Sequence, residues 1–578
     1  MKKILLLITF AGCISTLFSQ PVSTGFESLD YLYSISGKQT LAGQQGRMYW
    51  TLMRQLTGDY PTLWGEDLSF TPSDGTNTMH EWRTLMVHDA KQRWEKGAII
   101  SMMFHACPPT NPEPCDWQYG SGGNVLSKLS DAQWQELITD GTTLNKNWIA
   151  RLETIYPYLK ELNDAGVDLL FRPFHEMNQG AFWWGGRRGT NGTVKLYQIT
   201  HDYLVKTKGL TNLIWVWDVQ DFSTLATDLN DYDPGSDYWD VLALDVYWSD
   251  GTGYTTAKYN LIKNKAAGKP IAIGECDILP SSSSLYSQPN WTFFMCWREL
   301  TQQKNSDATI KALYNASNVL TLSQTGRTPA VDNPDKLMVC NFDDSYPYLA
   351  PAGGLVLNFA NAPADSPATG EIGAIKVPAG NPKAGYITIL LDEPINPRDY
   401  VGISFLAQAS VTAPFVVKLE QTANSTAQIQ DWNTYPKYTG NGDWQEVHIG
   451  FDVILNQLQG KIDANPNFPA SNYDRIILVP APYQNGLSAF TLNIDDIKLR
   501  TSWTGIWPVE NTDAIIIVVA NGTVNAKAGN GAPVSLKVYS VSGQEIANGI
   551  NQVQLAPKGA YIVKATVGNI SKMSKVVV

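Results

Sequence analysis

One stretch of the chain, "FRPFHEMNQGAFWWGG" at residues 171–186, sets ionisable groups beside aromatic rings. A second candidate carboxylate, Glu275, ends a later apolar run. Two carboxyl groups that flank a glycosidic bond can hydrolyse it with retention of configuration when they lie about 5 to 5.5 Å apart. One of them must hold a proton while the other is ionised. The reactive side chains of the first stretch are Arg172, His175, Glu176, Trp183 and Trp184.

The expected surroundings of the two glutamates differ. Glu176 precedes Met177 and the aromatic block, where partial loss of water favours the neutral carboxylic acid. We expect Glu275 to face Arg172 and Tyr247, a cation and a hydroxyl that favour its anion. The sequence therefore predicts Glu176 as the acid/base and Glu275 as the nucleophile. The alternative is that both glutamates belong to structural ion pairs.

Eight short apolar runs predict the elements that position these groups. The runs are rich in β-branched or aromatic residues, and helix-like stretches separate them. Near-continuous apolar strands that each lead into a helix favour a parallel (β/α)8 TIM barrel over an open sheet. Reactive groups of such a barrel lie where its strands end, at the C-terminal face. The runs occupy residues 39–46, 61–70, 97–106, 167–176, 212–221, 240–248, 269–277 and 292–297.

Local patterns around these runs make further predictions. Because side chains alternate along a strand, we expect Arg172 and Glu176 to point the same way, and likewise Asp245 and Tyr247. Apolar residues at helical spacing predict a helix over residues 147–166 that stops at a glycine. The proline inside that helix, at position 157, predicts a kink or a restart.

The composition bounds the class of protein. A formal charge of −11 and a sequence pI of about 5.1 argue against a nucleic-acid partner. The 19 tryptophans and 26 tyrosines suit neutral, hydroxyl-rich ligands, although a bulky core is the plainer explanation. We expect a monomer.

The N-terminal residues 1–20 have two lysines, a short apolar stretch and then small residues, which predicts a secretory signal peptide cleaved near Gln20. A looser alternative is a lipoprotein signal with lipidation at Cys13. Either signal predicts a secreted or cell-surface bacterial protein. In such an oxidising compartment, Cys107 and Cys115, which flank "CPPTNPEPC", could form a disulfide. No cysteine and histidine spacing resembles a zinc site, and we expect no catalytic metal.

The composition predicts three folded parts after the signal. Residues 21–330 form the catalytic barrel, residues 331–502 an all-β sandwich without a long helix, and residues 503–578 a smaller β-sandwich. In the middle part, aromatic residues could form a stacking platform or simply pack the core. Acidic residues there could hold a structural Ca²⁺ or be solvated turn carboxylates. The aromatic residues are Trp432, Tyr435, Tyr438 and Trp444, and the acidic ones are Asp343, Asp344 and Asp496.

Three motifs, "RPFHEMN…FWWG", "LDVYW" and "KPIAIGEC", resemble glycoside hydrolase family 26 in this order over residues 39–325. The best-known members are secreted endo-β-1,4-mannanases. The resemblance implies a (β/α)8 barrel, a retaining mechanism without a cofactor, and the same roles for Glu176 and Glu275. It further implies that Tyr247 hydrogen-bonds the nucleophile. The residues that it implies for substrate binding or support are His105, Arg172, His175, Trp183, Trp184, Asp245 and Trp297.

The chain departs from that family at one position. Many mannanases in the family have a tryptophan directly before "FWWG", where this chain has Ala181. The resemblance implies a β-mannan substrate, namely mannan, glucomannan or galactomannan. The alternatives are mixed-linkage β-glucan or β-1,3-xylan with the same mechanism, and a non-catalytic surface protein that binds glycans.

Two weaker resemblances concern the other parts. "NGDWQEVHIGF" and "FTLNIDDIKL" are similar to jelly-roll modules that secreted glycanases carry for carbohydrate binding. "VYSVSGQEIANG", "LAPKGAYIVKA" and the terminal "KVVV" resemble the type IX secretion sorting domain of Bacteroidetes proteins. The second resemblance implies the secretion machinery as a partner, and the alternative is a spacer or sugar-binding module.

Overall fold

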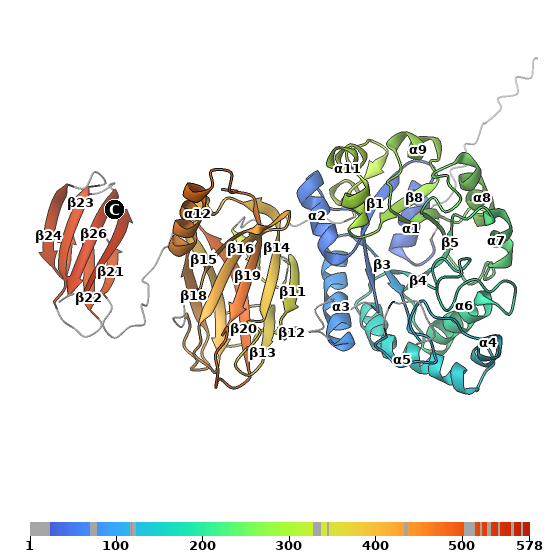
Figure 1. Cartoon of the computed structure of the whole chain (residues 1–578), viewed down its shortest axis with the longest axis horizontal. Helices are drawn as coiled ribbons and strands as arrows, with labels where there is room; N and C mark the ends of the chain where they lie inside the picture. Colours follow the sequence, from blue (N-terminus) through green and yellow to red (C-terminus); the bar gives the residue numbers. More distant parts are fainter. Residues whose placement is uncertain are drawn as a thin grey trace, which may run out of the picture. The chain divides into compact units, whose positions relative to one another are not determined.

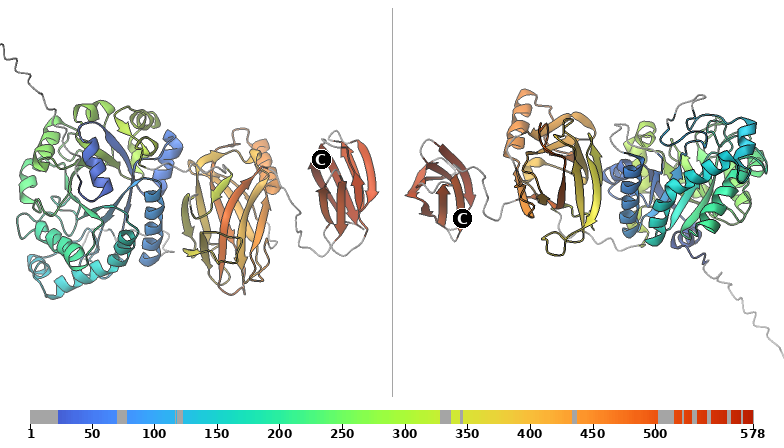
Figure 2. Two further views of the ribbon diagram at one scale, coloured as in Figure 1. Left: turned by 180° about the vertical axis from the view of Figure 1, so that it is seen from behind. Right: turned by 90° about the horizontal axis from the view of Figure 1, so that it is seen from below.

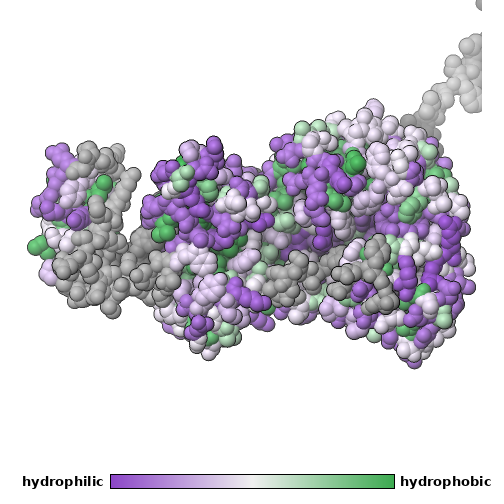
Figure 3. Space-filling view, viewed as in Figure 1, coloured by the Kyte–Doolittle hydropathy of each residue, from purple (hydrophilic) through white to green (hydrophobic). Residues whose placement is uncertain are grey.

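The computed structural model describes residues 23–69, 78–115, 117, 123–327, 337–343, 346–432 and 437–501, and further segments at 515–520, 523–528, 533–540, 544–556, 560–567 and 570–577. The chain forms two compact units, Met1–Arg500 and Thr501–Val578. The predicted signal segment, with Cys13, lies outside the described residues. Among the helices that are described, none has the length and apolar character needed to cross a membrane. Hydrophilic and near-neutral residues cover most of the visible face of the first unit (Figure 3).

A closed barrel of eight parallel strands begins the first unit and confirms the predicted fold class. The strands follow one another around the barrel in sequence order, and β1 closes it by pairing with both β2 and β8. Each predicted apolar run overlaps one strand. The strands are β1 (Thr40–Gln45), β2 (Leu63–Asp67), β3 (Ile99–Phe104), β4 (Leu169–Pro173), β5 (Leu213–Gln220), β6 (Val241–Val246), β7 (Ile271–Cys276) and β8 (Trp291–Cys296), and the short β9 (Val319–Leu320) pairs with β1.

Helices surround the barrel strands (Figure 1). The predicted helix exists as α5 and runs through Pro157 without a restart, and Gly166 lies just beyond its end with a φ of 70°. The helices are α1 (Glu27–Ile35), α2 (Arg47–Thr57), α3 (Met79–Glu95), α4 (Asp131–Leu137), α5 (Thr143–Asp164), α6 (Thr193–His201, which continues as a π-helix over Asp202–Thr207), α7 (Leu225–Asp231), α8 (Thr256–Ala266), α9 (Ser282–Ser287), α10 (Leu300–Lys304) and α11 (Asp307–Tyr314).

The N-terminal end of the barrel is filled by α1, which lies across it in the left view of Figure 2. Leu29, Leu32 and Ile35 of this helix join one apolar cluster with residues from the first half of the strands, such as Leu41 and Ile214. Because apolar side chains occupy this end, the polar groups of the barrel interior lie at the C-terminal end.

The sandwich that follows consists of two antiparallel sheets around a shared apolar core. The prediction that this part lacks a long helix was wrong, because α12 (Asp452–Ala464) buries Ile454 and Leu458 in that core. One sheet contains β10 (Met338–Cys340), β12 (Val356–Asn361), β13 (Glu371–Val377), β15 (Gly402–Ala409), β18 (Gln445–Gly450) and β20 (Phe490–Arg500), and the other contains β11 (Tyr348–Ala352), β14 (Tyr386–Ile395), β16 (Phe415–Gln421), β17 (Asn424–Asp431) and β19 (Tyr473–Pro480).

The sandwich packs against α2 and α3 of the barrel through buried polar contacts. Arg47 of α2 donates from Nε to Asp89 of α3 at 2.5 Å and from Nη2 to the carbonyl oxygen of Leu349 at 2.8 Å. The hydroxyl of Tyr346 donates to the same Asp89 carboxylate at 2.8 Å. Leu85 of α3 belongs to the apolar core of the sandwich. The barrel and the sandwich therefore share one buried interface within the first unit.

The second unit, described by itself, has a three-stranded and a four-stranded antiparallel sheet. Buried residues such as Val524, Leu536 and Val563 form its own apolar cluster. Its strands are β21 (Ile515–Ala520), β22 (Thr523–Ala528), β23 (Ser535–Ser540), β24 (Glu545–Ile550), β25 (Gln552–Gln554), β26 (Ala560–Val567) and β27 (Ile570–Val577).

The buried interface predicts a large stability effect at one carboxylate. We expect Asp89→Ala to lower the free energy of unfolding of the first unit by about 3–5 kcal/mol, because the Arg47 guanidinium would stay buried without its ionic partner. Urea denaturation followed by tryptophan fluorescence measures this. Arg54→Ala is the control, since its pair with Glu393 joins side chains that are 28% and 81% exposed. The control should change stability by less than about 1 kcal/mol, and equal losses in both variants would contradict the interpretation.

Candidate active site

The end of β4 turns sharply to bring Glu176 into the barrel mouth. The strand ends at Pro173, and Phe174 and Glu176 then adopt left-handed backbone conformations with φ of 55° and 49°. Because the strand stops before Glu176, this turn and not strand alternation sets the direction of the Glu176 side chain relative to Arg172. Such conformations cost about 1–3 kcal/mol each and persist where the surroundings fix them.

Hydrogen bonds from the aromatic block fix this turn. Trp184 donates from Nε1 to the carbonyl oxygen of His175 at 3.1 Å, and Trp183 donates from Nε1 to that of Ala106 at 2.7 Å. Both tryptophan side chains are at most 1% exposed. Asn178 donates to the carbonyl oxygen of Gln220 on β5 at 2.9 Å. Trp183 and Trp184 thus support the loop from behind and do not offer an open ring face to a ligand.

A β-bulge on β7 aims Glu275 into the same mouth. In the pairing of β6 with β7, Leu244 lies opposite Ile273 but Asp245 lies opposite Glu275, so Gly274 is an extra residue on β7. A bulge bends its strand and redirects the following side chain. Ala272, two residues before Gly274, packs in the barrel interior, so regular alternation would have turned Glu275 outward. The inward position of Glu275 depends on this irregularity.

The carboxyl groups meet at a distance that suits hydrolysis. One oxygen each of Glu176, Asp245 and Glu275 lies within 4.8 Å of the others. Arg172 donates from Nη2 to Glu275 at 3.1 Å, and the hydroxyl of Tyr247 donates to the other oxygen of Glu275 at 2.8 Å. The predicted site residues from β4, β6 and β7 therefore converge on one point.

Different partners separate the protonation states of the two glutamates. Burial raises the pKa of Glu176 well above its usual range, and the negative charge of Glu275 adds to the shift. Burial also raises the pKa of Glu275, but the Arg172 guanidinium and the Tyr247 hydroxyl oppose that rise. At neutral pH the geometry favours a protonated Glu176 beside an ionised Glu275, which is the division of roles that the sequence predicts.

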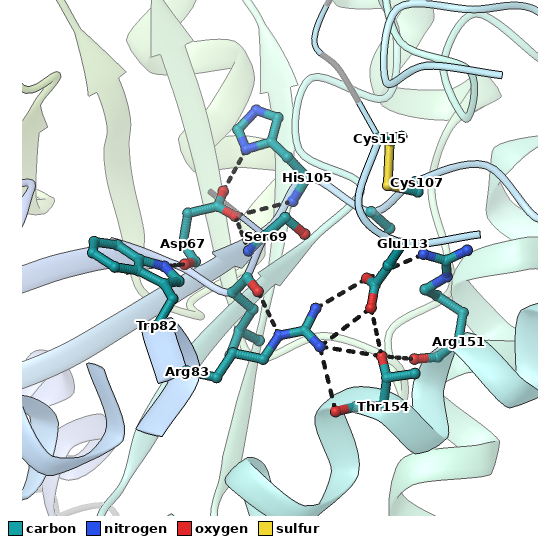
Figure 4. Close-up of polar contacts among 12 residues, drawn as sticks. Asp67, Ser69, Trp82, Arg83, His105, Cys107, Glu113, Cys115, Arg151 and Thr154 are labelled. Carbon is teal, nitrogen blue, oxygen red and sulfur yellow. Dashed lines mark hydrogen bonds and ion pairs between the residues drawn. A yellow bond between two sulfur atoms is a disulfide. The ribbon is translucent and has the colours of Figure 1, made fainter. Parts of the chain in front are cut away.

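Two histidines lie at the side of the glutamates. The rings of His105 and His175 meet edge to face, with centroids 4.3 Å apart. His105 is oriented by a hydrogen bond between its Nδ1 and the carboxylate of Asp67 at the end of β2 (Figure 4). Burial and the neighbouring His105 hold the pKa of His175 well below its usual range, so His175 is neutral.

Partly exposed tryptophans lie around these groups. Trp297, which the sequence predicts for this place, is half-buried with its ring centroid 6.2 Å from that of His105. Trp117 is 44% exposed and its ring centroid lies 5.1 Å from that of His105. Trp248, which is 43% exposed, follows Tyr247 directly. Sequence reasoning did not assign Trp117 or Trp248 to the site, although Trp248 ends the motif "LDVYW" and Trp117 lies two residues after Cys115.

The loop before Trp117 is fixed covalently and ionically. The structure joins Cys107 to Cys115, as the sequence predicts (Figure 4). Inside this loop Glu113 accepts hydrogen bonds from Arg83 at 2.9 Å and pairs with Arg151 at 3.2 Å. These contacts bind the loop to α3 and α5.

The three clustered carboxylates raise the question of a metal ion. Cations of the Ca²⁺ or Mg²⁺ type take oxygen ligands of this kind. Here the Nη2 atom of Arg172 lies 3.3 Å from both oxygens of Asp245 and 3.1 Å from Glu275. The guanidinium therefore already supplies the positive charge at the centre of the cluster.

Comparisons with known proteins place the barrel part of the chain in a family. Residues 18–324, more than half of the chain, match the family model described as glycosyl hydrolase family 26. The chain belongs to this family. The part that matches contains the barrel and every candidate active-site residue named above.

Several known proteins resemble about half of the chain. A mannan endo-1,4-β-mannosidase of Thermothelomyces thermophilus is 32% identical over 302 residues, which cover 51% of this chain and 60% of the relative. Mannan endo-1,4-β-mannosidase A of a Piromyces species is 26% identical over 51% of this chain and 48% of the relative. Among solved structures, GH26A from a Muricauda species is 33% identical, with a TM-score of 0.47, over 51% of this chain and 95% of that one. The chain thus spans about half to three fifths of the length of these two mannosidases.

The structure places the predicted aromatic and acidic residues of the sandwich in different surroundings. Tyr438 is buried, which places it in the core, while Trp432 is 40% exposed, and Tyr435 lies outside the described residues. Asp343 accepts a hydrogen bond from the backbone of Glu371 at 2.8 Å. Asp496 pairs with Lys498 at 3.2 Å, and Asp344 lies outside the described residues. The structural Ca²⁺ stays a prediction.

The hydrogen bond from Tyr247 predicts a shift in the pH dependence of turnover. Tyr247→Phe removes a donor that stabilises the Glu275 anion, so the pKa of Glu275 should rise. The acid limb of kcat/KM, where an ionised nucleophile is lost on protonation, should therefore move to higher pH. At the pH optimum we expect kcat/KM to fall by about 10- to 100-fold, which corresponds to the free energy of one hydrogen bond to a charged group.

The control is Tyr259→Phe on α8, which removes a hydroxyl that donates to Asn290 at 2.6 Å. This variant should keep the acid limb of the wild type in the same assay. An unmoved acid limb in Tyr247→Phe would contradict the role given to its hydroxyl.

Proposed function

We propose that this chain is a secreted, endo-acting glycoside hydrolase that cleaves β-1,4-mannosidic bonds with retention of configuration. The observation that carries this proposal is the pairing of Glu176 with Glu275. Their carboxylate oxygens lie within 4.8 Å, and their surroundings raise the pKa of Glu176 more strongly than that of Glu275. This separation leaves room for a sugar carbon but not for the additional water of an inverting mechanism.

The reaction follows from the two roles in two steps. Glu275 attacks the anomeric carbon while Glu176 gives its proton to the leaving oxygen, which produces a covalent glycosyl-enzyme and a shortened glycan. Glu176, now ionised, takes a proton from a water molecule that attacks the same carbon and releases Glu275. Arg172 and Tyr247 hold Glu275 in place throughout. The partly exposed rings of Trp117 and Trp297 can stack on the apolar faces of neighbouring sugars.

A β-mannan substrate is supported by the names of the relatives, which are mannan endo-1,4-β-mannosidases. Ala181 stands before the aromatic block and provides no ring for stacking at that place. The alternative substrates, mixed-linkage β-glucan and β-1,3-xylan, would use the same two glutamates.

Azide should separate the roles of the two glutamates. Glu275→Ala removes the nucleophile, so turnover of an activated aryl mannoside or manno-oligosaccharide should fall to background. Azide should restore it by attacking from the vacated face, and the product should be the α-glycosyl azide. Glu176→Ala should retain the first step on substrates with good leaving groups, and azide should then give the β-glycosyl azide. Proton NMR of the products distinguishes the two anomers.

The wild-type enzyme serves as the reference and should release reducing ends from glucomannan and galactomannan. Full activity in Glu275→Ala would refute the assignment of Glu275 as the nucleophile. Release of reducing ends from barley β-glucan alone would assign the chain to the alternative substrate class.

We further propose that the sandwich binds glycan. Support comes from two exposed rings, Trp432 after β17 and Tyr483 after β19, which are 40% and 60% exposed. Their centroids lie 6.4 Å apart, and their planes differ by only 25°. Tyr483 also holds a left-handed backbone conformation with a φ of 54°, which is uncommon for an aromatic residue. Two nearly parallel exposed rings suit successive sugar units of a polymer.

This binding can be tested in the full chain with the nucleophile removed by Glu275→Ala, so that the gel polymer is not degraded. The protein should be retarded in native gels that contain glucomannan, and Trp432→Ala with Tyr483→Ala should reduce the retardation. Each stacked ring should contribute about threefold to tenfold in affinity. Val401→Ala, which trims an exposed valine of the same sandwich, is the control. Unchanged retardation in the double variant would exclude these rings as the site.

We also propose that residues 503–578 are a type IX sorting domain that delivers the enzyme to the medium or the cell surface, with the N-terminal signal directing export. The separate β-rich unit with its own apolar core supports this proposal. Such a unit can be recognised, and removed, without disturbing the first unit.

A further inference from the structure

A carboxylate that sequence reasoning missed lies directly behind the site. Asp218 belongs to β5, two residues after Val216, which packs in the barrel interior, and Asp218 is 1% exposed. Arg172 donates to the Oδ2 atom of Asp218 from Nε at 2.8 Å and also from Nη2. Asp218 is thus the principal ionic partner of the guanidinium that holds Glu275.

Asp218 also lies beside Asp245, and a glycine makes room for them. A Cβ atom added to Gly274 would lie 2.6 Å from Oδ1 of Asp245 and 2.7 Å from Oδ2 of Asp218. It would also lie 2.9 Å from the side chain of Ala243. Any other residue at the bulge would push the two carboxyl groups away from each other. The lack of a side chain at this bulge therefore leaves the space that the carboxyl groups of Asp218 and Asp245 occupy.

The hydrogens of Arg172 are too few for three anions. Its Nη2 atom carries two hydrogens, yet it faces Asp218, both oxygens of Asp245 at 3.3 Å, and Glu275 at 3.1 Å. The contacts to Asp245 are the longest. The Oδ1 atom of Asp218 is buried and has no donor among the described residues. One proton held between the two aspartates would supply that missing donor and remove the surplus charge.

The charges around the pair decide which aspartate holds the proton. Burial raises the pKa of Asp245 well above its usual range, and the negative charges of Asp218 and Glu275 add to the shift. Burial also raises the pKa of Asp218, but Arg172 opposes that rise, which leaves Asp218 as the anion. The titratable or charged groups that surround the pair are Arg172 and Glu176 at the end of β4, Tyr197 on α6, Tyr247 after β6 and Glu275 on β7.

We propose that Asp218 is a positioning residue that shares one proton with Asp245, with Asp245 as the protonated member, and that fixes Arg172 against Glu275. This inference rests on the proposed function, because it assigns a purpose to the geometry of the nucleophile. The shared proton leaves one guanidinium facing two anions, Asp218 and Glu275. With Asp245 also ionised, a third negative charge beside Glu275 would favour protonation of the nucleophile.

Kinetics of two amide variants test this arrangement. Asp245→Asn replaces a neutral acid by a neutral amide that can donate to Asp218 in the same way. It should leave the acid limb of the kcat/KM profile where the wild type has it, because the charge beside Glu275 does not change. Asp218→Asn removes the ionic partner of Arg172 and should lower kcat/KM by about 10- to 100-fold.

Two kinetic outcomes would overturn the proposal. If Asp245 is an anion, removing its charge lowers the pKa of Glu275, and the acid limb of Asp245→Asn moves to lower pH. A kcat/KM for Asp218→Asn within about threefold of the wild type would show that Asp218 does not position Arg172. Thermal unfolding of each variant verifies that it is folded under the assay conditions.

An infrared measurement tests whether Asp245 holds the shared proton, without relying on turnover. The full chain with Glu176→Gln should still show the carbonyl stretch of a buried carboxylic acid at neutral pH, where exposed carboxyl groups are ionised. Adding Asp245→Asn should remove this band, and adding Tyr247→Phe should retain it. A spectrum in which Asp245→Asn changes no carboxylic acid band would refute the shared proton. Because this result needs no substrate, it stays separate from a failure to hydrolyse mannan.

Discussion

The site depends on one guanidinium that is enclosed by carboxyl groups at the mouth of the barrel. Arg172 meets Asp218, Asp245 and Glu275 in a space that excludes most water, and its side chain is 2% exposed. Breaking such a buried cluster by removing one partner is costly, because it leaves an uncompensated charge. The same low-dielectric setting makes each charge strongly sensitive to its neighbours. This explains how two glutamates a few ångströms apart can hold different protonation states.

The barrel could be predicted from sequence because its signal is repeated eight times. Each strand is a short apolar run, and each is followed by a helix, so errors of one or two residues at the ends do not change the topology. The residues Glu176, Glu275, Arg172, Asp245 and Tyr247 could be assigned to one site because parallel strands of a barrel end at the same face. The positions of these residues along the motifs were sufficient for that inference.

Their orientations could not be predicted, because both glutamates depend on departures from regular strand geometry. Glu176 lies in a turn with left-handed residues, and Glu275 follows the bulge at Gly274. Alternation is a property of regular strands and carries no information about either irregularity. Asp218 escaped prediction for a related reason, since a lone aspartate within an apolar run has no distinctive spacing. Trp183 and Trp184 adjoin the site, but the burial of Trp183 depends on a hydrogen-bond partner, Ala106, that is distant in sequence.

The sandwich is linked to the barrel mouth by a continuous series of polar contacts. The carbonyl oxygen of Leu349 in the sandwich accepts from the guanidinium of Arg47, while the backbone N–H of Arg47 donates to Glu66 at 2.8 Å. Glu66, at the end of β2, pairs with Arg298 at 2.7 Å, and that guanidinium lies 5.5 Å from the ring of Trp297. The sandwich therefore stabilises the side of the barrel mouth that carries Trp297, whether or not it also binds glycan.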